Sequence, residues 1–237
     1  LYAALKRAND AKSEFVRTVS HELKLPMTSI KGYAELMLHG IAGPVSDQQK
    51  QFLNTIRSNV ERMAVLVSDL ADISRIEAGR IKIDLKAVDV AAAVQDALKP
   101  LQAALDAKRQ TVDVRVPADL PKARTDPSRL AQVLTNLVSN ANKYSPVGAR
   151  ITVTAEPDAP HLRLSVEDTG VGISPADQEK LFTAFFRSEE PAIRQESGWG
   201  LGLHLARRLV EVLGGEIMVT SRTGQGSTFS FTIPLDE

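Results

Sequence analysis

Apolar residues recur at steps of three or four along the first third of the chain, which is the spacing of one face of an α-helix. One such run covers residues 1–37 and a second covers residues 52–73. The segment between them holds two glycines and a proline, and Ser46 then stands three residues before Gln49, as in a capping box at a helix start. The pattern therefore predicts a helical hairpin with a short connection.

A hairpin of two long amphipathic helices leaves part of each apolar face exposed, because each apolar stripe is wider than the contact that one partner helix covers. A second copy of the chain would bury the remainder. The sequence thus predicts a homodimer, with a four-helix bundle as the first domain, residues 1–80.

After the hairpin, alternating apolar and polar segments, typical of β-strands, are interleaved with helical segments. Strands at 149–157 and 161–170 are expected to pair across a turn, and strands at 216–221 and 226–234 to form a closing hairpin. Further strands are expected at 81–90 and 111–117, and helices at 90–110, 128–145 and 200–215. Strands interleaved with three helices predict a layered α/β sandwich as the second domain, residues 81–237.

Composition and charge exclude several classes of function. Lysine plus arginine and aspartate plus glutamate both number 29, so no net charge attracts nucleic acid or an anionic membrane. No cysteine is present, which excludes disulfides and cysteine-ligated zinc and fits a reducing, cytoplasmic location. No apolar run reaches the roughly 18 residues that span a bilayer. Because the chain starts at Leu1 in mid-helix, we expect a fragment, with any membrane attachment in segments that it lacks.

One histidine of the first helix lies next to a carboxylate and five residues before a proline. At about 100° per residue, His21 points away from the apolar stripe and toward solvent. Glu22 could fix its tautomer and leave the other ring nitrogen as a nucleophile, while Pro26 would remove one backbone hydrogen bond and bend the helix. A surface histidine without chemistry is the alternative interpretation.

Three polar side chains share one face of the helix expected at 128–145. Asn136, Asn140 and Lys143 are spaced by four and three residues, and the opposite face is apolar. An amide oxygen could coordinate Mg²⁺ and the ammonium could contact a phosphate, with Tyr144 packing against a base or ribose. A solvated helix surface is the alternative that the spacing alone leaves open.

Two glycine-containing stretches are candidates for contact with a ligand. "EDTGVGIS" places Asp168, Gly170 and Gly172 directly after an expected strand. An aspartic protease would need a second such aspartate and an apolar residue where Glu167 stands, so that interpretation is disfavoured. "GWGLGL", residues 198–203, precedes a helix, where close backbone approach and exposed N–H groups favour phosphate oxygens. Its spacing matches neither a P-loop nor a dinucleotide-binding fingerprint.

Taken in order along the chain, these segments resemble the sequence boxes of sensor histidine kinases of two-component signalling. The ATP-binding domain of that family is shared with type II topoisomerases and Hsp90-like chaperones. The H box is matched by "FVRTVSHELKLPMTSIKGY", the N box by "NLVSNANKYSP", the G1 box by "VEDTGVGIS", the F box by "LFTAFFRS" and the G2 box by "GWGLGL". The resemblance covers nearly the whole chain, and five boxes in the right order make it specific.

The resemblance implies a reaction and a set of site residues. ATP would phosphorylate His21, with Glu22 as base and orienting group, and the phosphoryl group would pass to an aspartate in the receiver domain of a response regulator. Asn140 would hold Mg²⁺. The implied nucleotide site consists of Asn136, Asn140, Lys143, Tyr144, Asp168, Gly170, Gly172, Arg187, Gly198, Gly200, Leu201, Gly202 and Leu203.

Within this implied site, Asp168 would accept a hydrogen bond from the adenine amino group, and Gly170 and Gly172 would let the backbone approach the base. The glycines of residues 198–203 would surround the phosphates, Lys143 would contact phosphate, and Asn136 would contribute near the Mg²⁺ held by Asn140. Residues 185–187 would anchor a lid of about ten residues, which must move for nucleotide to enter and leave.

The sequence departs from the family pattern at Leu25. The position four residues after the histidine is usually a threonine or asparagine, thought to orient water for dephosphorylation of the regulator, and a leucine side chain cannot form that hydrogen bond. We therefore predict autokinase activity with weak phosphatase activity. Trp199, the only tryptophan, lies within the G2 box, so its fluorescence should respond to nucleotide.

Two other functions stay open at the level of sequence. A protein serine kinase or ATPase of the same nucleotide-binding superfamily would not need His21. A dimeric scaffold could bind nucleotide only as a switch, although the presence of His21, Asn140, Asp168 and the G2 glycines argues against it. Acid lability of the phosphorylated chain and its loss in His21→Gln would separate the histidine kinase from the serine kinase.

Overall fold

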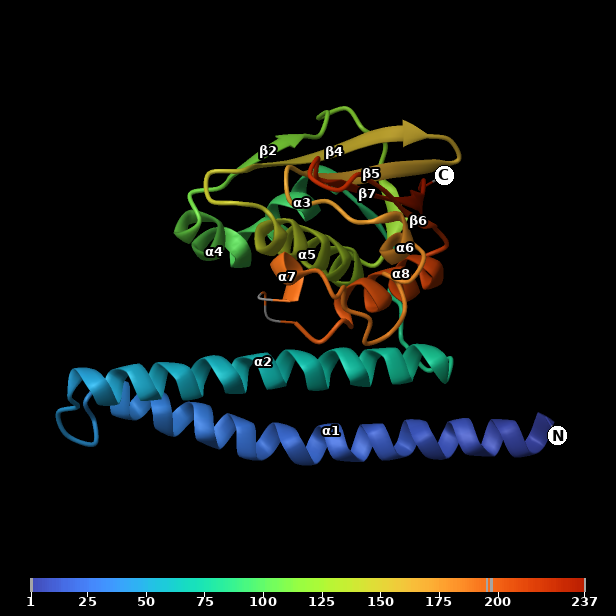
Figure 1. Cartoon of the computed structure of the whole chain (residues 1–237). Coiled ribbons are helices and arrows are strands. Elements are labelled where there is room, and N and C mark those ends of the chain that lie inside the picture. Colours follow the sequence, from blue (N-terminus) through green and yellow to red (C-terminus); the bar gives the residue numbers. More distant parts are fainter. Residues whose placement is uncertain (1, 195, 197, 237) are drawn as a thin grey trace. The chain divides into compact units, whose positions relative to one another are not determined.

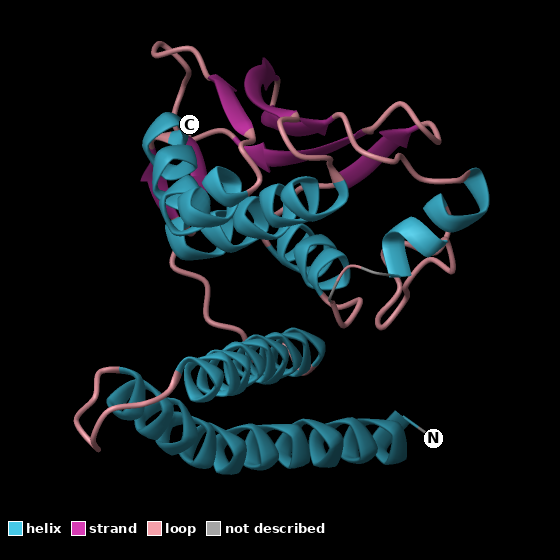
Figure 2. Cartoon of the chain, turned by 60° about the vertical axis from the view of Figure 1, so that its left-hand side comes forward, coloured by secondary structure: helices cyan, strands magenta, loops and turns pink. Residues whose placement is uncertain are grey.

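The computed structural model describes residues 2–194, 196 and 198–236. The chain divides into two compact units, Leu1–Ile81 and Lys82–Glu237. The first is entirely helical, and the second combines helices with β-strands (Figure 2). None of the described helices combines the length and the apolar composition needed to cross a bilayer.

The first unit is the predicted helical hairpin. Helix α1 covers Tyr2–Leu38 and helix α2 covers Asp47–Glu77 (Figure 1). The predicted capping box is confirmed: the backbone N–H of Gln49 donates to Ser46 Oγ at 3.2 Å, and the N–H of Ser46 donates to Gln49 Oε1 at 2.7 Å. These bonds satisfy two otherwise unpaired donors and fix where α2 begins.

Helix α1 continues through Pro26 and bends near its middle (Figure 1). Proline lacks the N–H that would bond the carbonyl four residues earlier. Next to it, Thr28 Oγ1 donates to the carbonyl of Lys24 at 2.8 Å and Ser29 Oγ donates to that of Leu25 at 3.3 Å. Such bonds to the preceding turn also bend helices, so the proline and the two hydroxyls account for the bend together.

The two helices bury only a narrow stripe of side chains against each other. Met27 on α1 and Val60 and Val67 on α2 form one buried cluster. A second set of apolar side chains stays exposed. It comprises Phe15, Leu23, Ile30 and Met37 on α1 and Phe52, Ile56 and Met63 on α2. The hairpin therefore covers only part of its apolar surface, as the width of the stripe leads one to expect.

The second unit is built on a five-stranded sheet. Its strands are β2 (Thr111–Arg115), β4 (Arg150–Asp158), β5 (His161–Asp168), β6 (Ile217–Ser221) and β7 (Ser227–Pro234). They lie in the order β2-β4-β5-β7-β6, with β2 parallel to β4 and all other neighbours antiparallel. Both predicted hairpins, β4 with β5 and β6 with β7, are confirmed.

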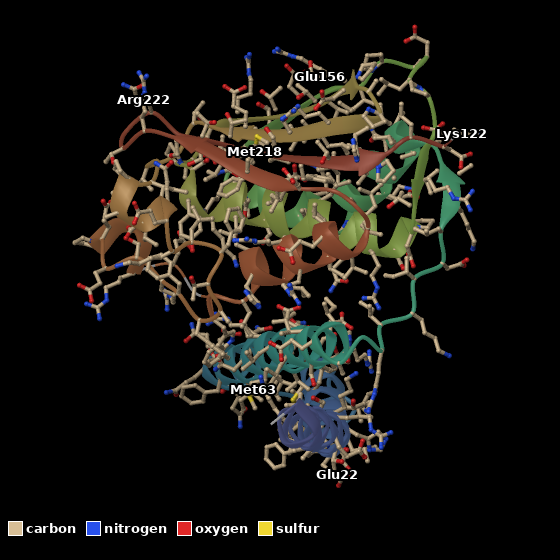
Figure 3. The ribbon with its side chains drawn as sticks, turned by 90° about the vertical axis from the view of Figure 1, so that its right-hand side faces the viewer. Glu22, Met63, Lys122, Glu156, Met218 and Arg222 are labelled. Carbon is tan, nitrogen blue, oxygen red and sulfur yellow. The ribbon has the colours of Figure 1, made fainter. Side chains whose placement is uncertain are left out.

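Three longer helices cover one face of this sheet (Figure 1): α3 (Val90–Leu98), α5 (Pro127–Tyr144) and α8 (Gly202–Val212). Helix α5 contacts both α3 and α8. Figure 3 shows Glu156 on the sheet face turned away from these helices. The core lies between the two layers, and its fully buried members include Leu130, Leu134, Leu137, Ile151, Leu162, Leu164, Leu205 and Phe231. The predicted α/β sandwich is therefore confirmed.

Two predicted elements differ from the structure. The strand expected at 81–90 is only β1 (Lys86–Val88), which pairs with β3 (Ala123–Thr125), because the N–H of Asp84 donates to Asp126 Oδ2 at 2.9 Å instead of to a strand. The helix expected at 90–110 is interrupted at Pro100, whose ring and missing N–H end the α-helical pattern. The remaining elements are η1 (Lys99–Leu101), α4 (Gln102–Ala107), α6 (Pro175–Gln178) and α7 (Pro191–Arg194).

Candidate active site

His21 lies on the solvent-facing side of α1, with its side chain 74% exposed. Its Nδ1 is 3.5 Å from Glu22 Oε1, a long contact for a hydrogen bond, and the Glu22 side chain is 72% exposed. Figure 3 shows Glu22 pointing outward from the helix. If Nδ1 carries the proton that faces this carboxylate, Nε2 holds the free lone pair and is the nucleophilic nitrogen.

Leu25, one turn after His21, is also exposed. Residues four apart on a helix are neighbours on its surface, so this leucine covers the surface next to the imidazole. Its side chain has no donor or acceptor with which to hold a water molecule there.

Helix α5 begins at a buried carboxylate. Asp126 Oδ1 accepts hydrogen bonds from the N–H groups of Ser128 at 2.9 Å and Arg129 at 3.2 Å, which satisfies the first donors of the helix. Burial alone would raise the pKa of Asp126, but the hydrogen bonds from Asp84, Ser128 and Arg129 together lower it. This cap fixes where α5 begins.

The polar face of α5 is placed as its spacing predicts, opposite a buried apolar face that includes Leu130, Leu134 and Leu137. Asn136, Asn140 and Lys143 are all partly exposed. Asn136 Nδ2 donates to the carbonyl of Gly202 at 3.3 Å, so the structure brings the N-box helix and the G2 box together.

Asp168 ends β5 and is 7% exposed. One of its carboxylate oxygens, Oδ1, accepts a hydrogen bond from the N–H of Gly170 at 2.8 Å. Burial raises the pKa of Asp168, while hydrogen bonds from the backbone of Gly170 and Ser227 act in the opposite direction. The buried hydroxyl of Ser145 faces the same carboxylate and also acts to lower its pKa, although it lacks the geometry of a full hydrogen bond. Such buried polar atoms are candidates for contact with a ligand.

A cavity of about 480 Å³ adjoins the G1 loop: Gly170, whose N–H donates to Asp168, belongs to its wall, whereas the Asp168 side chain does not line it. Its size is in the range of small-molecule sites. Of the predicted site residues, Lys143, Tyr144 and Gly170 line it, and burial raises the pKa of the Tyr144 hydroxyl. The other lining residues are Lys108, Ser145, Pro146, Val147, Thr169, Val171, Glu196 and Gly224.

The G1 glycines are needed by contacts within the chain. A Cβ on Gly170 would lie 2.5 Å from the carbonyl oxygen of Tyr144, and one on Gly172 would lie 2.0 Å from that of Arg222. Gly172 also has φ +70°, which disfavours any other residue. The structure thus assigns both glycines to close packing of the G1 loop.

The G2 box contacts the F box and leads directly into α8. Gly200 has φ +70°, and a Cβ there would lie 2.4 Å from the carbonyl oxygen of Phe186, whereas Gly198 has open space around it. The N–H of Phe185, itself at φ 64°, donates to the carbonyl of Gly200 at 2.9 Å. Leu201 is buried in the core and anchors the start of α8.

Gly202 and Leu203 occupy the first turn of α8 and are partly exposed. N–H groups in the first turn of a helix have no partner within the helix and can bind phosphate oxygens. A Cβ on Gly202 would make only an ordinary contact with the Asn136 side chain, at 3.7 Å.

The segment after the F box contains a short helix, α7, that the sequence pattern did not predict. Arg187 Nη2 donates to the carbonyls of Arg194 at 3.3 Å and Glu196 at 2.6 Å. The predicted lid also includes Gln195 and Ser197, which lie outside the described residues. Arg187 therefore holds the far end of this segment, and Glu196 belongs to the cavity wall.

Sequence reasoning missed two charged residues of the cavity wall, Lys108 and Glu196. Lys108 follows α4, in a segment for which the sequence predicts only a helix. Glu196 lies in a segment for which the sequence predicts only a lid. Neither stands at a motif position. Only the spatial closeness of α4 to the C-terminal end of α5 reveals Lys108.

A Mg²⁺ ion fits this site only together with a phosphate ligand. Among the described residues, no three His, Cys, Asp or Glu side chains cluster as metal ligands. The partly exposed amide of Asn140 offers one oxygen, and Mg²⁺ is often held by few protein groups plus substrate phosphates.

Family models match both units. A model described as "His Kinase A (phospho-acceptor) domain" matches residues 11–79, and one described as "Histidine kinase-, DNA gyrase B-, and HSP90-like ATPase" matches residues 125–237. Circadian input-output histidine kinase CikA of Synechococcus elongatus is 35% identical over 98% of this chain, and histidine protein kinase DivJ of Caulobacter vibrioides is 36% identical over 94%. The chain spans 31% and 37% of the length of these two relatives.

Solved structures agree with the sequence relatives. Full-length ShkA in complex with AMPPNP has a TM-score of 0.77 and 28% identity, over 94% of this chain and 46% of that one. The mycobacterial sensor histidine kinase MprB has a TM-score of 0.56 and 26% identity, over 64% of this chain and 98% of that one. With both units matched and the helical hairpin followed by the α/β ATPase fold, the chain belongs to the sensor histidine kinase family.

Proposed function

We propose that this chain is the catalytic core of an ATP-dependent protein-histidine kinase. One observation carries the proposal: the chain combines an exposed His21–Glu22 pair with a cavity lined by Lys143 and Tyr144 beside the buried Asp168. The relatives named above are histidine kinases, and the ShkA structure contains AMPPNP, which supports ATP as the substrate.

In the proposed reaction, His21 Nε2 attacks the γ-phosphorus of ATP, an N–P bond forms, the bond to the bridging oxygen breaks, and ADP leaves. Glu22 hydrogen-bonds to the Nδ1 proton or accepts it, which offsets the positive charge that develops on the ring. The phosphoryl group then moves to a carboxylate oxygen of an aspartate in a response regulator. Exposure of the imidazole serves both steps, because ATP and the regulator must each reach it.

The second unit, with residues 81–237 as our proposed ATP-binding domain, would bind the nucleotide. Asp168 accepts a hydrogen bond from the adenine amino group, and Tyr144 packs beside the base. Lys143 and the N–H groups at the start of α8 contact phosphate oxygens. Asn140, with Asn136 nearby, supplies amide oxygen toward Mg²⁺, which neutralises phosphate charge when it is bound.

Residues 1–80 would form the dimerisation and phosphotransfer domain. The exposed apolar set on α1 and α2, which includes Ile30 and Met63, is the surface that a second copy would cover. Pairing two hairpins through it would give a four-helix bundle with the apolar residues inside. The histidine-kinase relatives support both a dimer and a response-regulator partner, and the absence of cysteine fits a cytoplasmic location.

Incubation of the full chain with Mg-ATP labelled in the γ-phosphate tests the proposal. We expect protein-bound label that is lost in acid, as a phosphoramidate is, and that is absent in His21→Gln but present in the control variant His39→Gln. Acid-stable label that persists in His21→Gln would indicate a serine kinase of the same superfamily. Nucleotide binding without any label would indicate a scaffold that uses nucleotide as a switch.

A further inference from the structure

Lys108 is a charged residue of the cavity wall that none of the five sequence boxes contains. It directly follows α4, and its Nζ donates to the carbonyl oxygens of Asn142 at 2.9 Å and Lys143 at 2.8 Å, at the C-terminal end of α5. These carbonyls lack partners within the helix, so a cation there is favourable. The two bonds hold the ammonium group in place at the cavity.

An ammonium group has three donors, and the two carbonyls use two of them. The third is left for Glu196, whose Oε1 lies 3.5 Å from Lys108 Nζ. That distance is too long for a good hydrogen bond, so the contact is mainly electrostatic. The side chains of Lys108 and Glu196 are 30% and 35% exposed, and an ion pair with that access to water is weak.

Two hydrogen bonds hold the backbone of Glu196 in place. Arg187 donates to its carbonyl oxygen at 2.6 Å, and its own N–H donates to the carbonyl of Ile193 at 3.2 Å. Glu196 and Tyr144 both line the cavity. An acidic side chain thus faces the cavity at the place where a cation is already fixed.

We propose that Lys108 is an additional phosphate-binding residue of the nucleotide site and that Glu196, its ion-pair partner, competes with phosphate for the Lys108 ammonium group. This inference rests on the proposed function, because the ligand that replaces Glu196 is the phosphate chain of a nucleoside di- or triphosphate. The exchange replaces a weak, long ion pair by a charge-assisted hydrogen bond to a phosphate oxygen. Lys108 needs no rearrangement for this, because the two α5 carbonyls keep it in place.

The proposal predicts opposite effects for the two residues. Removing the charge in Lys108→Met should weaken ATP and ADP binding by about tenfold, as expected for one charge-assisted hydrogen bond. Removing the competitor in Glu196→Gln should strengthen binding by about two- to fivefold, the range of a partly exposed ion pair. Adenosine, which has no phosphate, should bind equally to the parent chain and to Lys108→Met.

Titration calorimetry of the full chain with ATP, ADP and adenosine tests these effects. Glu189→Gln is the matched control, because it removes the same charge from the same segment at an exposed residue outside the cavity wall. We expect Glu189→Gln to bind ATP like the parent, and Glu196→Gln to have no effect once Lys108→Met is present. Equal strengthening by both glutamine variants, or unchanged ATP binding in Lys108→Met, would overturn the inference.

The same titrations separate this inference from the proposed function. If the parent chain binds ATP but the Lys108 and Glu196 variants behave like it, only the inference fails. If the parent chain binds no nucleotide, both fail. If Lys108→Met weakens adenosine binding as much as ATP binding, Lys108 supports the cavity wall and does not bind phosphate, which also overturns the inference.

Discussion

His21 in the helical hairpin is 74% exposed beside a carboxylate at 3.5 Å, whereas Asp168 in the second unit is 7% exposed and accepts a backbone hydrogen bond at 2.8 Å. The hairpin leaves its apolar residues partly uncovered, while the second unit closes its core between a sheet and three helices. The second unit therefore has a closed core and a buried carboxylate, as our proposed nucleotide site requires, whereas the hairpin exposes the apolar surface and the histidine that we propose other molecules contact. Substitutions should damage the two units in different ways.

Asp168→Asn should weaken nucleotide binding more strongly than any other substitution proposed below. The amide keeps the shape but presents the wrong charge to the adenine amino group, and we expect ATP affinity to fall by about 10- to 100-fold, the range for a hydrogen bond to a charged group. Calorimetric titration measures the affinity. The helical content of α1 and α2 should not change, and parent-like affinity would contradict the assignment of Asp168.

A related prediction concerns pH. Because burial raises the pKa of Asp168 above its ordinary value of 3.8, the folded chain binds this proton more tightly than the unfolded chain. The contribution of Asp168 to stability therefore falls as pH rises from the ordinary value through the folded pKa, and then stays constant. The unfolding free energy of Asp168→Asn relative to the parent should rise across that window. Denaturant titrations over this pH range measure the difference in unfolding free energy, with Glu156→Gln as the control. A difference between Asp168→Asn and the parent that does not change with pH would contradict the prediction.

The next largest effect should come from glycine packing in the second unit. Gly200→Ala places a Cβ 2.4 Å from the carbonyl of Phe186 at positive φ, whereas Gly198→Ala meets open space. We expect Gly200→Ala to reduce the unfolding free energy by about 2–4 kcal/mol, combining left-handed strain with overpacking. Gly198→Ala should change it by less than about 0.5 kcal/mol. Equal effects of both variants would show that packing does not fix the G2 loop.

A charge introduced among the exposed apolar residues of the hairpin should weaken the proposed dimer. Ile30→Glu puts a carboxylate on the surface that we assign to the dimer, so we expect the dimer dissociation constant to rise at least about tenfold. Analytical ultracentrifugation would measure it. Asn54→Glu adds the same charge at an exposed polar residue of α2 and should leave the dimer intact. A dimer unaffected by Ile30→Glu would place the interface elsewhere.

A smaller, opposite effect is expected at Leu25. If the leucine next to His21 limits phosphatase activity because it cannot orient water, Leu25→Thr should increase dephosphorylation of the regulator while autophosphorylation is kept. Loss of phosphate from a purified phospho-regulator over time measures this gain. If Leu25→Val, which adds no hydroxyl, produces the same gain, side-chain size is the cause.

Much of the fold follows from local sequence. The capping box at Ser46, the helical hairpin and the β4–β5 and β6–β7 pairs all rest on neighbouring residues and were predicted. The interruption of the helix expected at 90–110 also has a local cause, Pro100, which the helical interpretation overlooked. The other error arose where distant residues intervene. Asp126 takes the N–H of Asp84 away from an expected strand, and no local pattern contains that bond.

The candidate site shows the same division. The shared face of Asn136, Asn140 and Lys143 could be predicted from helix periodicity, and the boxes indicated Asp168. The packing of Gly172 against the backbone of Arg222 could not be predicted from the sequence, because the two residues are far apart along the chain. The cavity-wall position of Lys108 likewise depends on the fold that brings α4 to the end of α5.

The most direct test of the central claim is to map the phosphorylated residue by mass spectrometry under alkaline conditions after incubation with Mg-ATP. We expect a phosphoryl group on His21, and much less of it in Asp168→Asn at an ATP concentration near the parent's dissociation constant, because ATP must first bind to the second unit. A phosphoryl group on a serine, on a threonine or on another histidine, with His21 unmodified, would contradict it.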